Sequence, residues 1–122
     1  MNQKFIGLFK KERDVFNKYE EPYDKSINIL FAYYTYEDYN GRAFVLFERD
    51  GKLYEVNGGH CSCYGLEEQW EPEETTIEDL KYRMTNGELG YDSYDNENYF
   101  RDELREYIKE NFKWWKKNLE WN

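Results

Sequence analysis

The chain has 122 residues and is poor in the residues that most often carry soft-metal and nucleophile chemistry, with only two cysteines and one histidine. It has no apolar run near the roughly 20 residues that a membrane-spanning helix needs, and no apolar stretch typical of a secretory signal near its N-terminus. The two cysteines are separated by one residue, so a disulfide between them would be strained, and a reducing cell disfavours it. We therefore expect a cytoplasmic protein of a bacterial host cell, with no membrane partner.

Aromatic and charged residues are abundant instead, at 20% and 35% of the chain. This length suits one buried core, so the sequence predicts a single domain over residues 1–122. The formal charge is -9 and the excess is local, because residues 67–97 carry 2 basic and 11 acidic side chains. A concentrated acidic region repels nucleic acid and attracts basic surfaces. The alternative is that these acids only keep an aromatic-rich chain in solution.

The first half of the chain predicts a helix followed by strands. Apolar residues at three- and four-residue spacing predict a helix over residues 4–20. Residues 26–36, 42–49 and 52–56 are rich in β-branched and aromatic residues, and Asn-Gly and Asp-Gly pairs between them indicate hairpin turns. Gly58 and Gly59 are expected to break the third strand. A short edge strand or a helical turn is expected over residues 66–70.

The second half of the chain predicts two helices. Thr75 or Thr76 is expected to cap a helix, because a short apolar pattern with acids in its first turn follows, and Asn86-Gly87 is expected to end it. Residues 88–98 lack periodicity and predict a loop. A long helix is expected over residues 99–120. The fold class is therefore α+β: an antiparallel β-meander of three to four strands packed against an N-terminal helix and a long C-terminal helix.

Residues 60–63, His-Cys-Ser-Cys, hold three potential ligands for a soft metal ion. Zinc prefers thiolate and imidazole ligands, and residues two apart in an extended segment face the same side. We expect His60, Cys61 and Cys63 to bind a structural zinc ion, with a fourth ligand from a nearby carboxylate (Glu55, Glu67 or Glu68), water or a second protomer. The open alternative is a metal-free loop in which the thiols are buried and His60 bonds to the backbone.

A catalytic role is not expected for this segment. A cysteine nucleophile needs a base within hydrogen-bond reach, and the side chains of the adjacent His60 and Cys61 diverge in an extended chain. We therefore predict that the protein is not an enzyme. The alternative is a small metal-dependent hydrolase that uses this loop with Glu67 or Glu68 as its base.

The acidic region that follows is the predicted partner-binding face. Rows of carboxylates can occupy a basic groove as phosphates do, and an aromatic side chain often anchors such an interface. The alternative is that acids near a helix start only favour its dipole. Direct nucleic-acid binding is not expected, because the basic residues of the last helix alternate with acids. The predicted partner-binding residues are Glu67, Glu68, Trp70, Glu71, Glu73, Glu74, Glu78, Asp79, Asp92 and Asp95.

The Gly-Gly-His-Cys-Ser-Cys core followed by Gln-Trp-Glu-Pro-Glu-Glu-Thr, within residues 58–75, resembles a segment of small acidic phage and prophage proteins. The chain is also similar in kind to phage anti-defence proteins, including zinc-containing anti-CRISPR inhibitors of Cas9. The resemblance implies a monomeric or dimeric phage-encoded inhibitor. Its expected partner is a host defence protein with a basic nucleic-acid-binding surface, with Cas9 as the leading expectation. A virion structural or assembly protein is the alternative.

Overall fold

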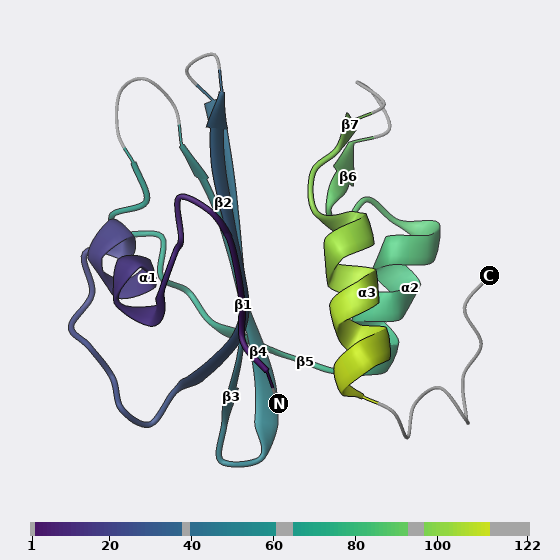
Figure 1. Cartoon of the computed structure of the whole chain (residues 1–122), viewed down its shortest axis with the longest axis horizontal. Helices are drawn as coiled ribbons and strands as arrows, with labels where there is room; N and C mark the ends of the chain where they lie inside the picture. The colour runs from purple at the N-terminus through teal and green to yellow at the C-terminus, as the bar shows by residue number, and fades with distance from the viewer. Residues whose placement is uncertain (1, 38–39, 61–64, 93–96, 113–122) are drawn as a thin grey trace. The chain divides into compact units, whose positions relative to one another are not determined.

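The computed structural model describes residues 2–37, 40–60, 65–92 and 97–112, and its mixed helix and strand content confirms the α+β class (Figure 1). It divides into two compact units, Gln3–Thr75 and, with Asn2, the described residues from Thr76 onward. The predicted single domain stays a prediction. The elements are β1 (Lys4–Gly7), α1 (Glu12–Tyr19), β2 (Asn28–Glu37), β3 (Asn40–Arg49), β4 (Lys52–His60), β5 (Glu73–Thr75), α2 (Ile77–Asn86), β6 (Tyr91–Asp92), β7 (Glu97–Asn98) and α3 (Arg101–Asn111).

The first unit is a five-stranded sheet in the order β1-β2-β3-β4-β5. Strands β2, β3 and β4 form the predicted antiparallel meander, while β1 pairs parallel with β2 and β5 pairs antiparallel with β4. Asp50 and Gly51 connect β3 to β4 with φ of 54° and 77°. Two positive φ values in a two-residue loop match the twist of the flanking strands, which is why Asp-Gly predicts this hairpin.

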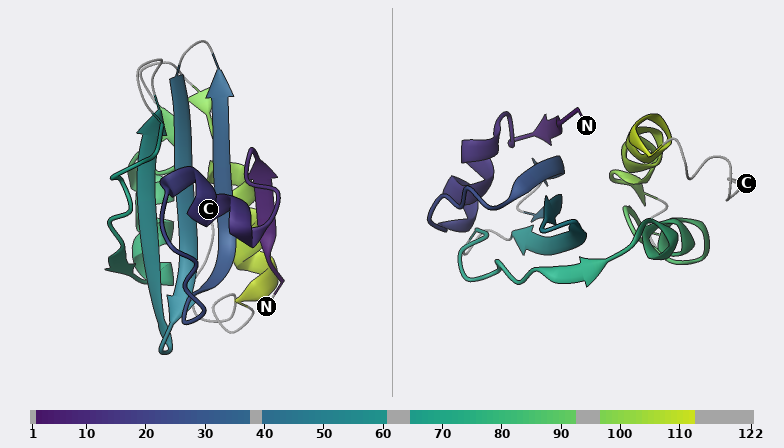
Figure 2. Two further views of the ribbon diagram at one scale, coloured as in Figure 1. Left: turned by 90° about the vertical axis from the view of Figure 1, so that its left-hand side faces the viewer. Right: turned by 90° about the horizontal axis from the view of Figure 1, so that it is seen from below.

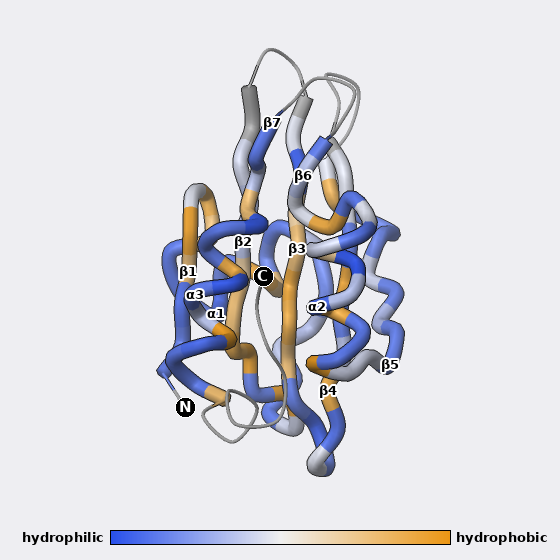
Figure 3. Tube along the Cα trace, turned by 90° about the vertical axis from the view of Figure 1, so that its right-hand side faces the viewer, coloured by the Kyte–Doolittle hydropathy of each residue, from blue (hydrophilic) through white to orange (hydrophobic). Residues whose placement is uncertain are grey.

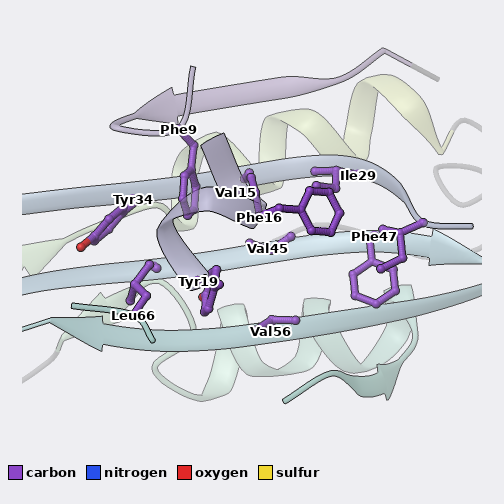
Figure 4. Close-up of a cluster of buried hydrophobic side chains, with 13 residues drawn as sticks. Phe9, Val15, Phe16, Tyr19, Ile29, Tyr34, Val45, Phe47, Val56 and Leu66 are labelled. Atoms are coloured by element: carbon purple, nitrogen blue, oxygen red, sulfur yellow. The ribbon is translucent and has the colours of Figure 1, made fainter. Parts of the chain in front are cut away.

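Helix α1 lies across one face of this sheet (Figure 2). Its Val15, Phe16 and Tyr19 enter a buried cluster with Val45 from β3 and Val56 from β4 (Figure 4). The middle of β3 is hydrophobic over consecutive residues (Figure 3), and the run Ala43–Phe47 is buried throughout. Both faces of this strand are therefore withdrawn from water, as its unbroken apolar run predicts.

The predicted helix over residues 4–20 is wrong in its first half, where the chain forms strand β1. Phe5 and Ile6 pair with Ala32 and Tyr33 of β2. Gly7 then takes a φ of 73°. The helix begins only at Glu12, where the Asp14 carboxylate accepts the N–H groups of residues 10 and 11 at 2.9 and 3.1 Å. Pairing with β2, which no local pattern encodes, overrides the helical spacing.

The predicted break of the third strand at Gly58 and Gly59 is also wrong. Strand β4 continues to His60, with Gly58 opposite Ala43 and Gly59 opposite Arg42. Gly58 serves close packing, since a Cβ on it would stand 2.9 Å from the Tyr19 hydroxyl. Glycine in a strand interior often marks such an approach.

The second unit contains α2, the β6–β7 hairpin and α3, with the two helices side by side. Helix α2 begins as predicted, because the Thr76 hydroxyl accepts the Asp79 N–H at 3.1 Å, and it ends at Asn86 before Gly87. The region predicted as a loop holds the short β6–β7 pair.

Helix α3 begins against a carbonyl. The Gly90 carbonyl oxygen accepts the N–H groups of Tyr99, Phe100 and Arg101 at 2.8, 3.0 and 3.2 Å, which satisfies donors that a helix start leaves unpaired. The predicted helix beyond residue 112 lies outside the described residues. Among the described helices, none is long and apolar enough to cross a bilayer.

Candidate functional site

The side chain of Gln69 holds together the two ends of the segment that contains the predicted metal ligands. Its Oε1 accepts the Gly59 N–H at 2.8 Å, and its Nε2 donates to the carbonyls of Gly59 at 2.8 Å and Gly65 at 2.7 Å. Strand β5 covers only Leu53–Glu55 of β4. Gln69 therefore supplies, at Gly59, the donor and acceptor that a neighbouring strand would supply.

The turn that positions Gln69 is itself anchored. The Glu67 carboxylate accepts the Gly65 N–H at 3.1 and 3.3 Å, and the Gln69 N–H donates to the Leu66 carbonyl at 3.1 Å. The Leu66 side chain is buried in the core against Gly58. Glu68 has a φ of 66°, which a tight turn requires here. Sequence reasoning missed Gln69, because a single glutamine between Glu68 and Trp70 has no distinctive pattern.

Of the predicted metal ligands, His60 is described only in its backbone, at the end of β4, and Cys61 and Cys63 lie outside the described residues. Glu67 bonds to Gly65 as above, and the buried Glu55 accepts the Asn57 side-chain amide at 3.0 Å. Within the described parts of the chain, no group of three or more His, Cys, Asp or Glu side chains is arranged to hold a metal ion. The predicted zinc site stays a prediction.

The predicted acidic face has an exposed part on the sheet unit. Glu68 and Glu71 lie before β5, and Glu73 and Glu74 lie in it, all with exposed side chains. The Glu74 carboxylate lies 3.8 Å from the Lys52 ammonium, with both side chains more than half exposed. Such a surface pair is weak and leaves the acid accessible. Glu67 is half-buried and bonded to Gly65, so it is not part of this exposed set.

The other predicted acids belong to the second unit. Glu78 and Asp79 are exposed in the first turn of α2, and the Asp79 carboxylate accepts the Arg83 Nε at 2.9 Å. Asp92 is half-buried in β6. Asp95 lies outside the described residues. Acids in this turn favour the helix dipole whether or not they also contact a partner, and Asp79 is in addition paired with a cation.

Trp70, the predicted aromatic anchor, is half-buried at the margin of the core. Its ring stacks on Phe47 with centroids 5.8 Å apart and planes 10° apart, and meets Tyr19 edge-on at 5.1 Å. It also contacts Phe16, which meets Tyr23 edge-on at 5.4 Å. On the other side, Phe47 stacks on Tyr54 at 5.2 Å. We call this series the aromatic row, and its members are Tyr23, Phe16, Trp70, Phe47 and Tyr54.

The hydroxyl of Tyr19 is a polar group in an apolar surrounding. The residue is fully buried, and its hydroxyl has no hydrogen-bond partner within the described part of the chain. Burial, and secondarily the neighbouring Tyr34, raise the pKa of this hydroxyl above its usual value. The group stays neutral at physiological pH and lies directly beneath Gly58.

Comparison with protein-family models, with curated proteins and with solved structures finds no match.

Proposed function

We propose that this protein is a non-enzymatic, phage-encoded inhibitor that binds a nucleic-acid-dependent bacterial defence protein through its acidic face. A Cas9-type effector is the leading candidate for the partner. The observation that carries the proposal is a set of four exposed acids at the edge of the sheet. Glu68 and Glu71 precede the edge strand β5, and Glu73 and Glu74 lie in it. The His60, Cys61 and Cys63 segment is proposed to hold its shape with a structural zinc ion.

The acids lie along one edge of the sheet, where a basic groove can reach both of its faces. Side chains of a strand alternate between faces, so Glu73, opposite Glu55, and Glu74, opposite Tyr54, point to opposite sides of this edge while both stay exposed. Carboxylates along such a segment attract the lysines and arginines that otherwise contact phosphates. The attraction accelerates encounter and weakens as salt rises.

The segment that carries the acids is held in place before a partner arrives. Trp70 packs on Phe47 at one end, and β5 pairs with β4 at the other. Gln69 bonds to Gly59 and Gly65 just before it. A partner therefore meets carboxylates on an ordered backbone, which lowers the entropic cost of binding.

The partner is expected to contact side chains rather than add a strand. Strand β5 has only three residues, Pro72 precedes it without an N–H, and its exposed side chains are acidic. Short, charged edge strands next to proline resist pairing with another chain. Electrostatics and the aromatic surface then provide the contact.

The salt dependence of binding tests this proposal. We expect the protein to bind a purified Cas9-type effector with an affinity that falls steeply between about 50 and 300 mM salt, over which the Debye length shortens roughly 2.5-fold. Glu71→Gln/Glu73→Gln should reduce both the affinity and the slope. The matched control is Glu106→Gln, which removes an exposed acid from α3 that is outside the predicted partner-binding set. Binding that is independent of salt, or equal in the two variants, would contradict the proposal.

A further inference from the structure

The hydroxyl of Tyr19 and the side-chain oxygen of Gln69 lie around the same point over Gly58. A Cβ on Gly58 would stand 2.9 Å from the Tyr19 hydroxyl and 3.3 Å from Gln69 Oε1. Because glycine has no Cβ, no side-chain atom of residue 58 occupies this point. The fold therefore brings a hydroxyl from α1 and an amide oxygen from the turn before β5 around one glycine of β4.

These two groups use their hydrogen-bonding capacity differently. Among the residues that the structure describes, the fully buried Tyr19 hydroxyl has no partner, which is unfavourable for a polar group away from water. Burial raises the pKa of this hydroxyl, so it keeps its proton and remains a donor at neutral pH. Gln69 Oε1 accepts the Gly59 N–H at 2.8 Å, and an amide oxygen can accept more than one hydrogen bond.

Gly59 is the member of this cluster that can turn to water. It is exposed near the end of β4, beyond the part that β5 covers, whereas Gln69 is half-buried. When Gly59 separates from Gln69, water replaces the partners of its N–H and its carbonyl at little net loss. The freed Gln69 Oε1 can then accept the Tyr19 hydroxyl, while Gln69 Nε2 keeps its bond to the Gly65 carbonyl at 2.7 Å.

We propose that the Gln69 side chain changes partner within the folded sheet unit. In the arrangement described above, its Oε1 accepts the Gly59 N–H. In a second, less populated arrangement, it accepts the Tyr19 hydroxyl, and the end of β4 at Gly59 opens to water. The Tyr19 ring meets Trp70, the residue after Gln69, edge-on at 5.1 Å, so the change also reaches the segment that carries the exposed acids. The inference does not depend on the proposed function.

Hydrogen exchange at the Gly59 amide in the full chain tests this change of partner. The Tyr19 hydroxyl stabilises the open arrangement, so Tyr19→Phe should make opening rarer and slow exchange at Gly59 about two- to tenfold, the size of one hydrogen bond. Tyr23→Phe removes the hydroxyl of an exposed tyrosine that follows α1, and it should leave the rate unchanged.

A second control separates this local effect from a gain in stability of the whole sheet unit. In a Gln69→Ala chain the hydroxyl has no glutamine oxygen to bond to, so adding Tyr19→Phe should not alter the Gly59 rate, whereas a general gain in stability would persist.

Two results would overturn the inference. One is exchange at Gly59 that Tyr19→Phe leaves unchanged or accelerates. The other is equal slowing with and without the Gln69 side chain, which would show that the hydroxyl does not act through Gln69. Since the measurement needs no partner, either result leaves the acidic face to be tested by the salt dependence of binding.

Discussion

Gly7 approaches the backbone of Tyr34 so closely that a Cβ at this position would overlap the Tyr34 carbonyl oxygen. The same residue has a φ of 73°, and the N–H of the next residue, Leu8, donates to that carbonyl at 2.8 Å. Gly7 is therefore the point where β1 leaves the sheet, and only glycine meets both conditions.

Replacing Gly7 should lower the free energy of unfolding far more than replacing a glycine that has the same backbone conformation but open space around it. Gly51 has a φ of 77°, and a Cβ on it would have no other group within 4 Å, so Gly51→Ala should cost roughly 1–2 kcal/mol of unfolding free energy. Gly7→Ala adds overpacking and should cost roughly 2–5 kcal/mol. Urea denaturation of the two variants measures the difference, and equal losses would contradict the close approach of β1.

Loss of the Gln69 side chain should loosen the segment it holds. Gln69→Ala removes three hydrogen bonds to Gly59 and Gly65 and should lower the free energy of unfolding by about 1–3 kcal/mol. Gln69→Glu should cost more, since it loses both donors and places a charge against two carbonyl oxygens. Hydrogen exchange at the Gly59 amide should accelerate in both. The control is Glu68→Gln, an exposed change at the neighbouring residue. Unaltered hydrogen exchange at Gly59 in Gln69→Ala would show that the Gln69 side chain does not hold this segment.

Removing the Tyr19 hydroxyl should not destabilise the sheet unit at neutral pH. The hydroxyl is buried without a partner within the described residues, so Tyr19→Phe should be neutral or stabilising by up to about 1 kcal/mol. Burial raises the pKa of the Tyr19 hydroxyl in the folded chain, so the unfolded chain loses this proton first as pH rises above the ordinary tyrosine pKa of about 10. The folded wild-type chain keeps its full stability below that pH and loses stability above it, whereas Tyr19→Phe does not. The advantage of the variant over wild type should therefore grow from about pH 9 to about pH 11.

Urea denaturation across this pH range measures the effect, with Tyr82→Phe as the control for loss of one exposed tyrosine. A Tyr19→Phe variant that is less stable than wild type by more than about 1 kcal/mol would mean that the hydroxyl is hydrogen-bonded in solution.

The meander, its Asp50-Gly51 turn and the capped start of α2 at Thr76 are predictable, because their signals are local. The strand β1 is not, since Phe5 and Ile6 have helical spacing and become a strand only by pairing with β2. Gly58 has the local signature of a strand break, yet its missing Cβ makes room for Tyr19 and Leu66. Contacts distant in sequence decide these cases, and no single-sequence pattern encodes them.

The exposed acids of the candidate site are also predictable, because runs of charge rarely enter a core. The way in which they are held is not. The glutamine that bonds to Gly59, and the stacking of Trp70 on Phe47, depend on the register of β4 and on the course of the turn before β5. The sequence predicts Trp70 as a partner anchor, and its packing on the core is the additional role that the structure assigns to it.

The central claim is that the exposed carboxylates of the sheet unit stand in for a polyanion. The most direct measurement is competition, in which the protein is titrated into a guide-loaded Cas9-type effector and bound target DNA is followed by fluorescence anisotropy. We predict that the wild-type chain displaces the DNA, and that Glu71→Gln/Glu73→Gln/Glu74→Gln weakens displacement roughly three- to a hundredfold while unfolding as the wild type does. DNA that stays bound while the protein also binds, or a triple variant that competes equally well, would contradict the account.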